Sequence, residues 1–478
     1  MGLVTPVDPV PVADLGRVHF IAIGGAGMSG IARIMLSRGV PVSGSDSADS
    51  QLLAELAAAG ARVHVGHDAA HVAGADTVVV SSAIRAENPE LMAAAERGLR
   101  VLHRSAALAS VMLDKQGIAV TGTHGKTTTT SMITTILRHS GADPAYVIGG
   151  ILAETGLGAA DGTGRQFVAE ADESDASFLN LAPNAAVVTS VEADHLDNYG
   201  TLAAIEEAFG KFAARLPAGG MLVACADAPG ALALTRQVGL GVAALTYGTS
   251  ADADYRITGF EQRGMTSRFT VTGGPGTALA DSAPVPVEIA VPGRHFALNA
   301  TAALALTAEL GVDPAVAAAG LAAYRGARRR MELKGEADGV QVVDSYAHHP
   351  TELAADLAAA REIVAGGRLI AVFQPHLYSR TRLFAAEFGA ALGRADEVIV
   401  MDVYAAREDP EEGVTGDLIA RAVPDGRAQF MPDRESVPAT AASLAKPGDM
   451  IMTMGAGDVT DLGPKILVAL RERSGEVT

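Results

Sequence analysis

The chain has very little cysteine, few aromatic residues and no excess of positive charge. Among its 478 residues there is one cysteine, Cys225, and no tryptophan, and aromatic residues make up 4%. A single cysteine excludes an intrachain disulfide and favours a reducing compartment, so we expect a cytoplasmic protein. A net charge of −18 argues against unspecific binding to nucleic acids or anionic membranes. It does not exclude anionic substrates, which need only local positive charge.

Long hydrophobic runs are also absent. No apolar run reaches the roughly 18 residues that a membrane-spanning helix needs, so we expect no membrane insertion. The proline-rich start lacks the basic residues and apolar core of a signal peptide, and we expect residues 1–15 to form a disordered tail. A chain of this length exceeds one compact core, which predicts several domains.

Strand-like apolar runs alternate with helical patterns through three blocks, residues 16–112, 113–327 and 328–478. This alternation predicts parallel sheets covered by helices, that is, an α/β protein. Between about residues 245 and 290 the helical periodicity vanishes, and short alternating runs predict a small antiparallel excursion.

A glycine-rich turn lies between a predicted strand and a predicted helix at residues 121–130, T-G-T-H-G-K-T-T-T-T. Backbone N–H groups of such a turn and the following helix N-terminus bind phosphate oxygens. Lys126 would reach the β- and γ-phosphates, and the Thr127 hydroxyl would ligate Mg²⁺. The strict P-loop needs a glycine where this chain has Val120, so a chance Gly/Thr-rich turn is the alternative to an ATP or GTP site.

A second glycine-rich turn follows the first predicted strand. Gly25, Gly27 and Gly30 match G-x-G-x-x-G, and Asp46 ends the next strand, where an acid meets a ribose hydroxyl in dinucleotide-binding folds. Read alone, this pattern predicts an NAD-dependent oxidoreductase. A UDP-sugar also presents a pyrophosphate and a ribose, and a tight turn without a ligand is a third interpretation.

Acidic residues follow two later strands of the second block. The run E-A-D-E-S-D at residues 170–175 holds four carboxylates, which repel one another unless a cation lies among them. Mg²⁺ prefers such oxygen ligands, whereas a solvated acidic loop is the plainer alternative. His195 lies between Asp194 and Asp197 at the next strand end and is a candidate metal ligand.

The third block opens on the basic run Arg328 to Arg330, which is either a solvated face or a phosphate clamp. Residues 344–352, D-S-Y-A-H-H-P-T-E, follow a predicted strand and open a helix, with Pro350 suited to its first turn. Arg380 follows another strand and could grip an amino acid carboxylate with two parallel hydrogen bonds.

Taken in order, these motifs resemble those of the Mur ligases, over about residues 17 to 465. The turn T-G-T-H-G-K-T resembles the nucleotide loop of the Mur ligases and of the folylpolyglutamate synthetases, and the D-H-x-D around His195 resembles the motif of the Mur ligases. Segment 19–32 and F-Q-P-H-x-Y-S-R-T at 373–381 resemble the alanine-adding branch of that family. The resemblance implies three α/β domains: an N-terminal Rossmann-like parallel sheet, a central P-loop-type ATPase domain and a C-terminal Rossmann-like domain that closes over the site.

It also implies a reaction: ATP-dependent ligation of L-alanine to the carboxylate of UDP-N-acetylmuramate through an acyl phosphate, with two Mg²⁺ ions, in peptidoglycan precursor synthesis. The implied catalytic residues are Lys126, Glu173, His195, Arg330 and His348, of which Glu173 and His195 join Thr127 as metal ligands. The implied ATP-binding residues are Gly122, Thr123, His124, Gly125, Lys126, Thr127, Thr128, His295, Asn299, Arg330 and Asp344. The implied UDP-sugar residues are Gly25, Ala26, Gly27, Met28, Ser45, Asp46, His67, Ser82 and Arg104, and the implied amino-acid residues are Tyr346, His348, His376 and Arg380.

The sequence departs from the family pattern at Phe296, Ser345 and Leu377. Lys211 is the only lysine on the helix where related ligases carry a carbamylated lysine, and we expect it to be unmodified. His67 and Arg104 also fit a solvated surface role. The alternatives are a ligase that adds a recycled peptide to the same sugar, an NAD-dependent oxidoreductase and a non-catalytic UDP-sugar sensor. The oligomeric state, monomer or homodimer, is left open.

Overall fold

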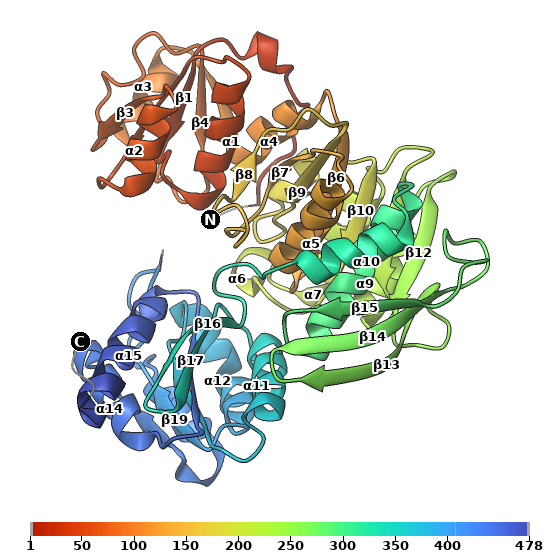
Figure 1. Cartoon of the computed structure of the whole chain (residues 1–478). Coiled ribbons are helices and arrows are strands. Elements are labelled where there is room, and N and C mark those ends of the chain that lie inside the picture. Colours follow the sequence, from red (N-terminus) through yellow and green to blue (C-terminus); the bar gives the residue numbers. More distant parts are fainter. Residues whose placement is uncertain (1–2, 407, 476–478) are drawn as a thin grey trace. The chain divides into compact units, whose positions relative to one another are not determined.

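The structure of the protein is a computed structural model that describes residues 3–406 and 408–475. Its chain divides into two compact units. The first unit holds residues 1–259, 269–287 and 298–324, and the second holds residues 260–268, 288–297 and 325–478. Figure 1 colours and labels the elements along the chain.

The first sheet is a five-stranded parallel sheet in the order β3-β2-β1-β4-β5. From β1 the chain first adds β2 and β3 on one side and then β4 and β5 on the other, so the strand order changes direction between β1 and β4. Open α/β sheets bind ligands beyond the carboxyl ends of the strands at such a point. Its strands are β1 (Val18–Ile21), β2 (Val42–Asp46), β3 (Arg62–Val65), β4 (Thr77–Val80) and β5 (Arg100–His103), and its helices are η1 (Val12–Asp14), α1 (Ala26–Ser37), α2 (Gln51–Ala58), α3 (Pro89–Glu96) and α4 (Arg104–Met112).

The central sheet is mixed and has ten strands in the order β15-β14-β13-β12-β11-β10-β6-β9-β7-β8. The strands that bear on function, β10, β6 and β9, are parallel neighbours. The strands are β6 (Gln116–Thr121), β7 (Ala145–Val147), β8 (Ala159–Ala160), β9 (Gln166–Glu170), β10 (Ala185–Val188), β11 (Met221–Cys225), β12 (Ala243–Gly248), β13 (Tyr255–Arg263), β14 (Thr266–Gly273) and β15 (Val285–Ile289). The helices are α5 (Lys126–His139), η2 (Ser177–Asn180), α6 (Leu196–Tyr199), α7 (Leu202–Ala213), α8 (Pro229–Leu234), α9 (Arg294–Glu309) and α10 (Pro314–Ala323).

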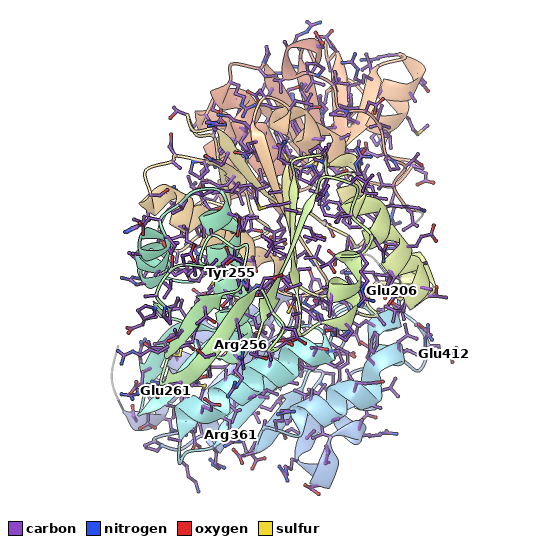
Figure 2. The ribbon with its side chains drawn as sticks, turned by 90° about the vertical axis from the view of Figure 1, so that its right-hand side faces the viewer. Glu206, Tyr255, Arg256, Glu261, Arg361 and Glu412 are labelled. Atoms are coloured by element: carbon purple, nitrogen blue, oxygen red, sulfur yellow. The ribbon has the colours of Figure 1, made fainter. Side chains whose placement is uncertain are left out.

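Strand β13 shows why the helical pattern disappears in this region. Tyr255 is buried and donates from its hydroxyl to Glu309 at 2.5 Å, while the next residue, Arg256, is exposed (Figure 2). Alternate burial is the period-2 pattern of a strand with one covered face. Because only Gly264 and Met265 separate β13 from β14, the two strands form a hairpin.

The third sheet has six strands in the order β16-β17-β21-β18-β19-β20, all parallel except β16, which pairs antiparallel with β17. Its strands are β16 (Glu332–Ala337), β17 (Val340–Ser345), β18 (Leu369–Phe373), β19 (Glu397–Val400), β20 (Ala428–Phe430) and β21 (Met450–Met454). The helices are α11 (Pro350–Val364), α12 (Tyr378–Leu392), α13 (Asp417–Ala422), η3 (Pro424–Gly426), η4 (Arg434–Ser436), α14 (Val437–Leu444), η5 (Asp458–Asp461) and α15 (Leu462–Ser474). Fully buried strand residues such as Val342, Ile370 and Ile451 form its core with Ile466 of α15.

The predicted fold class, an α/β protein with parallel sheets at both ends and a mixed central one, is confirmed. Helix α9 begins at Arg294, directly after Gly293, whose φ of +109° ends the preceding extended segment. The domain boundaries at 112/113 and 327/328 remain predictions. No helix in the described ranges has both the length and the hydropathy of a membrane-spanning segment.

The predicted disordered tail makes specific contacts where the structure describes it, whereas Met1 and Gly2 lie outside the described residues. Backbone N–H groups of Val4, Val7 and Val10 donate to the Asp175 carbonyl, Asn180 Oδ1 and Ser110 Oγ at 2.8–3.3 Å. Its disorder in solution stays a prediction.

Candidate active site

Three loops of the first unit meet because they follow three neighbouring parallel strands. The glycine-rich turn follows β6, the acidic loop follows β9, and the segment leading to His195 follows β10. Carboxyl ends of parallel strands lie at one edge of a sheet. The sheet therefore brings together side chains that are 70 residues apart in the sequence.

Two glycines shape the turn that follows β6. Gly122 has φ +134° and Gly125 has φ +80°, in the region that favours glycine. A Cβ at Gly122 would overlap the Thr189 hydroxyl, and a Cβ at Gly125 would lie 2.6 Å from Oδ1 of Asn299. Asn299 of α9 is thus placed against the turn, as an ATP-site residue should be.

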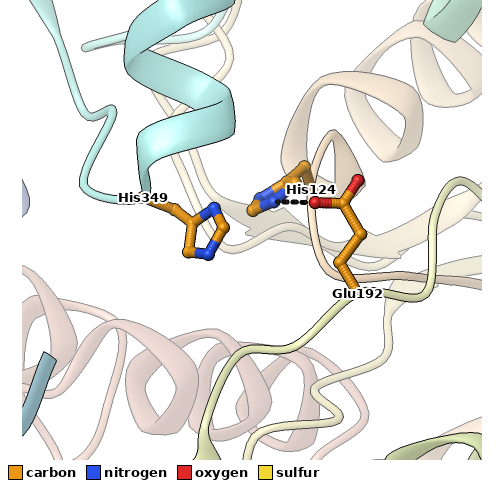
Figure 3. A group of neighbouring side chains, drawn as sticks. All are labelled: His124, Glu192 and His349. Atoms are coloured by element: carbon orange, nitrogen blue, oxygen red, sulfur yellow. Dashed lines mark ion pairs between the residues drawn. The ribbon is translucent and has the colours of Figure 1, made fainter. Parts of the chain in front are cut away.

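The hydroxyls of Thr189 and Ser190, the two residues that follow β10, fix the rest of the turn. Thr189 donates to the carbonyl of His124, and Ser190 Oγ accepts from the His124 N–H at 3.1 Å. Thr123 Oγ1 accepts from the Glu192 N–H at 2.8 Å. His124 also forms an ion pair of 3.5 Å with Glu192, drawn in Figure 3.

Lys126 opens α5, and its ammonium is held where a nucleotide phosphate would lie. Nζ donates to the carbonyls of Gly122 and Thr123 at 2.7 and 3.2 Å and to Glu173 Oε1 at 2.8 Å. Burial favours the neutral amine, yet the carboxylates of Glu173, Glu170 and Asp172 outweigh it and raise the Lys126 pKa. Lys126 is therefore protonated, and its ammonium pairs with the Glu173 carboxylate.

Glu173 is the centre of a small set of metal-type donors. It is 2% exposed, and Oε1 lies 3.6 Å from Nε2 of His195, whose ring is also 3.5 Å from Asp194. Within the described ranges, its buried Oε2 has no hydrogen-bond partner. Such an oxygen carries a desolvation cost that a cation would remove.

Thr127 adds a hydroxyl to this edge, and its Oγ1 donates to Glu170 Oε1 at 3.1 Å. The other oxygen of Glu170 accepts from the Gly149 N–H at 2.7 Å. Thr128 is buried within α5. Oxygen and imidazole donors in a buried, carboxylate-rich edge suit a divalent cation.

The glycine-rich turn of the first sheet has the expected geometry. The Gly24 N–H donates to Asp46 Oδ2 at 2.9 Å, and α1 begins at Ala26 after Gly25. Met28 is 2% exposed, and its N–H donates to the Gly25 carbonyl at 2.9 Å. Only the backbone of Met28 therefore lies at the turn, because its side chain belongs to the core.

Ser45, near the end of β2, and His67, which follows β3, lie around a buried carboxylate that the sequence analysis missed. Glu90 is fully buried, and its oxygens accept from Ser45 Oγ at 2.5 Å and from His71 Nδ1 at 2.7 Å. His67 Nδ1 lies 3.0 Å from Ser45 Oγ, and His19 Nε2 lies 3.5 Å from Glu90. Although burial alone would raise it, hydrogen bonds from His19, Ser45 and His71 lower the pKa of Glu90 to about 2.

Ser82 and Arg104 both bond to the acidic loop that follows β9. Ser82 Oγ donates to Asp175, and Arg104 Nη2 donates to Asp172 Oδ2 at 2.5 Å. Burial opposes ionisation of Asp172, but Arg104 and Lys126 hold its pKa well below its usual range. The side chains of His67 and Arg104 are 22% and 23% exposed; His67 Nδ1 lies 3.5 Å from Glu90, and Arg104 pairs with Asp172.

In the second unit, the run from Asp344 begins with the last two residues of β17, which pairs with β21. Asp344 is fully buried, and its two oxygens accept from Thr453 Oγ1 at 2.7 Å and Thr460 Oγ1 at 2.6 Å. Arg329 lies 3.5 Å away through Nε. These contacts fix the Asp344 carboxylate within the sheet, and its role in ATP binding remains a prediction.

Arg330, Tyr346 and His348 come together in that unit. The Arg330 guanidinium lies 5.1 Å from the centre of the Tyr346 ring, and Nη1 is 3.9 Å from Glu352. His348 Nδ1 lies 3.3 Å from Glu352 and 3.0 Å from the Tyr346 carbonyl. The Tyr346 and His348 rings meet edge to face at 5.3 Å.

His376 and Arg380 follow β18 and adjoin this group. The His376 ring lies 6.0 Å from that of His348, and its Nδ1 is 3.5 Å from Nη1 of Arg380, which is 5% exposed. Leu377 takes φ +72° at the start of α12 and is buried. His295, also in this unit, lies 3.2 Å from Asp356.

Other side chains were missed by the sequence analysis. Tyr199 donates from its hydroxyl to the Glu173 carbonyl at 2.5 Å, and burial raises its pKa. Asn198 Nδ2 donates to the Ser174 carbonyl at 2.9 Å. Both stand in the sequence directly after the D-H-x-D motif, which was the available signal. Nothing in the sequence marks Glu90. Lys211 is exposed and pairs with Glu207 at 2.7 Å.

Comparisons with known proteins agree with this geometry. Three family models match in order: Mur ligase family, catalytic domain, at residues 17–116; Mur ligase middle domain at 120–307; and Mur ligase, glutamate ligase domain, at 329–457. The chain is 56% identical to the UDP-N-acetylmuramate–L-alanine ligase of Thermobifida fusca over 98% of this chain and all of that protein. It is also 56% identical to the ligase of that name from Kineococcus radiotolerans, over 97% and 98% of the two chains.

Solved structures give the same result. A UDP-N-acetylmuramate–alanine ligase from Thermotoga maritima superposes with a TM-score of 0.78 at 28% identity, covering 96% of this chain and 99% of that one. A murein peptide ligase from Psychrobacter arcticus gives 0.71 at 26% identity over 97% and 99%. With its three sheets, its phosphate-binding turn and its acidic strand ends in the family's order, the chain belongs to the Mur ligase family.

Proposed function

We propose that the protein ligates L-alanine to the carboxylate of UDP-N-acetylmuramate at the expense of ATP, a step of peptidoglycan precursor synthesis. The observation that carries this proposal is the turn between β6 and α5, with Lys126 bound to Glu173 beside His195. Relatives that are 52–56% identical over nearly the whole chain bear the name of this ligase, which supports the choice of substrates.

ATP binds at the turn of residues 122–128. Its phosphates lie on the N–H groups at the start of α5, and Lys126 exchanges Glu173 for phosphate oxygens. Asn299 against Gly125 supports a nucleotide contact from α9. Charge grows on the transferring phosphoryl group, so a lysine fixed in advance by two backbone carbonyls lowers the barrier.

Mg²⁺ is the cation that these donors suit, and we propose that two ions bind. Thr127, Glu173 and His195 would hold it, and the orphaned Oε2 of Glu173 is the atom that supports this assignment. Bound there, Mg²⁺ would neutralise phosphate charge. The number of ions is part of the proposal.

UDP-N-acetylmuramate binds at the carboxyl edge of the first sheet. Its diphosphate lies at the start of α1 near Gly25, Gly27 and Arg104, and Asp46 accepts a ribose hydroxyl. Ser45 and His67, fixed by Glu90, bound the nucleoside end. The sugar's carboxylate attacks the γ-phosphorus of ATP, the bond from that phosphorus to the β,γ-bridging oxygen breaks, and ADP departs, which leaves an acyl phosphate on the sugar.

L-Alanine binds in the second unit, with its carboxylate on Arg380 and His376. Its amine attacks the acyl carbonyl, and phosphate leaves. His348 receives the amine proton, with Glu352 orienting its ring. Arg330, held against Tyr346, steadies the phosphoryl oxygens. Closure of this domain would exclude water and protect the acyl phosphate.

Two competing interpretations, a peptide-adding ligase and an oxidoreductase, are each less well supported by the observations. A peptide-adding ligase shares the fold, as the Psychrobacter arcticus structure shows, but the 56% identical relatives carry the alanine name. An oxidoreductase leaves Lys126 and Glu173 without a role. We propose a cytoplasmic enzyme that acts on small molecules, as a monomer or homodimer.

The test is isothermal titration of the protein with UDP-N-acetylmuramate, followed by product analysis with L-alanine and with the recycled peptide. The proposal expects sugar binding and an alanine adduct. A peptide adduct alone would favour the recycling ligase, and absence of sugar binding would contradict the proposal.

A further inference from the structure

Arg104 lies between the glycine-rich turn of the first sheet and the acidic loop after β9. A Cβ built on Gly27, the second residue of α1, would lie 3.1 Å from its Nη1. Its Nη2 lies 2.5 Å from Asp172 Oδ2. One guanidinium thus contacts the start of α1 and a carboxylate of the other loop at the same time.

The start of α1 is the place where a diphosphate would be held. Backbone N–H groups at a helix start, glycines that allow close approach and one arginine form an anion site. In the structure, the anion on this arginine is the Asp172 carboxylate. Both side chains are three-quarters or two-thirds covered, with 23% and 34% exposed, so solvent screens the pair only in part.

Ser82 repeats the arrangement at the end of β4. It is also a predicted UDP-sugar residue, and its hydroxyl donates to the carboxylate of Asp175. His103 Nε2 lies 3.1 Å from the same hydroxyl and 3.8 Å from the same carboxylate. Two independent side chains of the expected diphosphate site are therefore occupied by two carboxylates of one loop.

We propose that Asp172 is a built-in competitor for the diphosphate of the UDP-sugar: it holds Arg104 until the diphosphate displaces it. This inference rests on the proposed function, since it needs a UDP-sugar at the first sheet. Glu173, the residue after Asp172, binds Lys126 of the ATP turn at 2.8 Å. The carboxylate that the diphosphate displaces is therefore adjacent in sequence to the one that binds Lys126. The acidic loop therefore contacts residues of both proposed substrate sites.

Asp172→Asn is the test variant. The amide keeps an Oδ1 acceptor for the Ser174 N–H, which Asp172 accepts at 3.0 Å, and removes the charge that Arg104 holds. We expect its Kd for UDP-N-acetylmuramate, measured by isothermal titration without ATP, to fall about fivefold below that of the unmodified protein. Tighter binding after the loss of an ion pair is a result that a purely structural pair would not give.

The effect must pass through Arg104. In an Arg104→Met background, sugar binding is weaker and Asp172→Asn brings no further gain. Asp161→Asn is the matched control, because it breaks the Arg38–Asp161 pair, at 2.9 Å, in the same unit. It leaves the Kd unchanged. Asp172→Ser serves as the second variant if thermal melting shows that the asparagine form is unfolded.

An unchanged or higher Kd in a folded Asp172 variant would overturn the proposal, and so would a gain that persists without Arg104. Failure of the unmodified protein to bind the UDP-sugar would instead overturn the proposed function, together with this inference.

Discussion

At the scale of single residues, we propose that Lys126 carries the phosphate chemistry, because its ammonium is held in place by its neighbours. Two carbonyls and Glu173 hold it at 2.7–3.2 Å. Lys126→Met keeps most of the side-chain volume but removes the charge. We expect kcat to fall roughly 10²–10³-fold, as for loss of one preorganised charge-stabilising donor. Titration calorimetry should give an unchanged Kd for the UDP-sugar, and a normal kcat would contradict the role.

His348 is the residue that we assign to amine deprotonation. Its Nδ1 lies 3.3 Å from Glu352 and 3.0 Å from a carbonyl, so the ring orientation is fixed. We expect His348→Ala to lower kcat about 10²-fold, the usual size of a lost proton acceptor. The affinities for ATP and the UDP-sugar should be nearly intact. Steady-state kinetics with all three substrates check this, and an unchanged kcat would remove His348 from the mechanism.

Glu90 makes stability depend on acid pH. Its pKa falls from an ordinary 4.5 to about 2 in the folded chain, which corresponds to about 3 kcal/mol of stabilisation. Because the folded-state value is the lower one, this contribution is complete above about pH 4.5 and is lost as the pH falls towards 2. Glu90→Gln should thus cost about 3 kcal/mol at pH 7 and clearly less at pH 3.

Urea unfolding at both pH values measures this difference. Glu206→Gln, at an exposed position on α7 (Figure 2), is the control and should change stability at neither pH. An equal loss for Glu90→Gln at pH 7 and pH 3 would show that its charge is not what stabilises the cluster.

At the scale of elements, the turn before α5 depends on glycine for two separable reasons. Gly125 and Gly141 flank the same helix with φ +80° and +81°, but only at Gly125 would a Cβ meet a neighbour, Asn299 at 2.6 Å. Alanine at either site costs about 1 kcal/mol of stability through backbone strain. Gly125→Ala alone should also weaken ATP binding, in calorimetry, by tenfold or more. Equal ATP affinity in the two variants would contradict this geometry.

Strand ends were the part of the site that the sequence could predict. Lys126, Glu173 and His195 follow three apolar strands, and parallel pairing of β10, β6 and β9 brings such ends together. Contacts set by tertiary packing were out of reach. Glu90 is one acid on a short helix, and only the fold shows that three histidines and a serine surround it. The resemblance implies that Asp344 binds ATP, but only the fold shows that two threonine hydroxyls hold its carboxylate.

At the scale of the whole molecule, the three sheets follow one plan. Helices connect strands of each sheet, and most candidate residues lie at or just beyond the carboxyl ends of strands: β1 to β5 in the first sheet, β6, β9 and β10 in the second, and β17 and β18 in the third. Three family models match the chain in the same order. Alternating strands and helices made this architecture predictable, because local periodicity is a sequence property.

The central claim is that phosphoryl transfer and amide formation are coupled on this chain. The measurement that tests it most directly is phosphate release from ATP with Mg²⁺, with and without UDP-N-acetylmuramate and each of the L-amino acids. We predict release that requires both the UDP-sugar and L-alanine. Release without the sugar, or no release with any amine, would contradict the account.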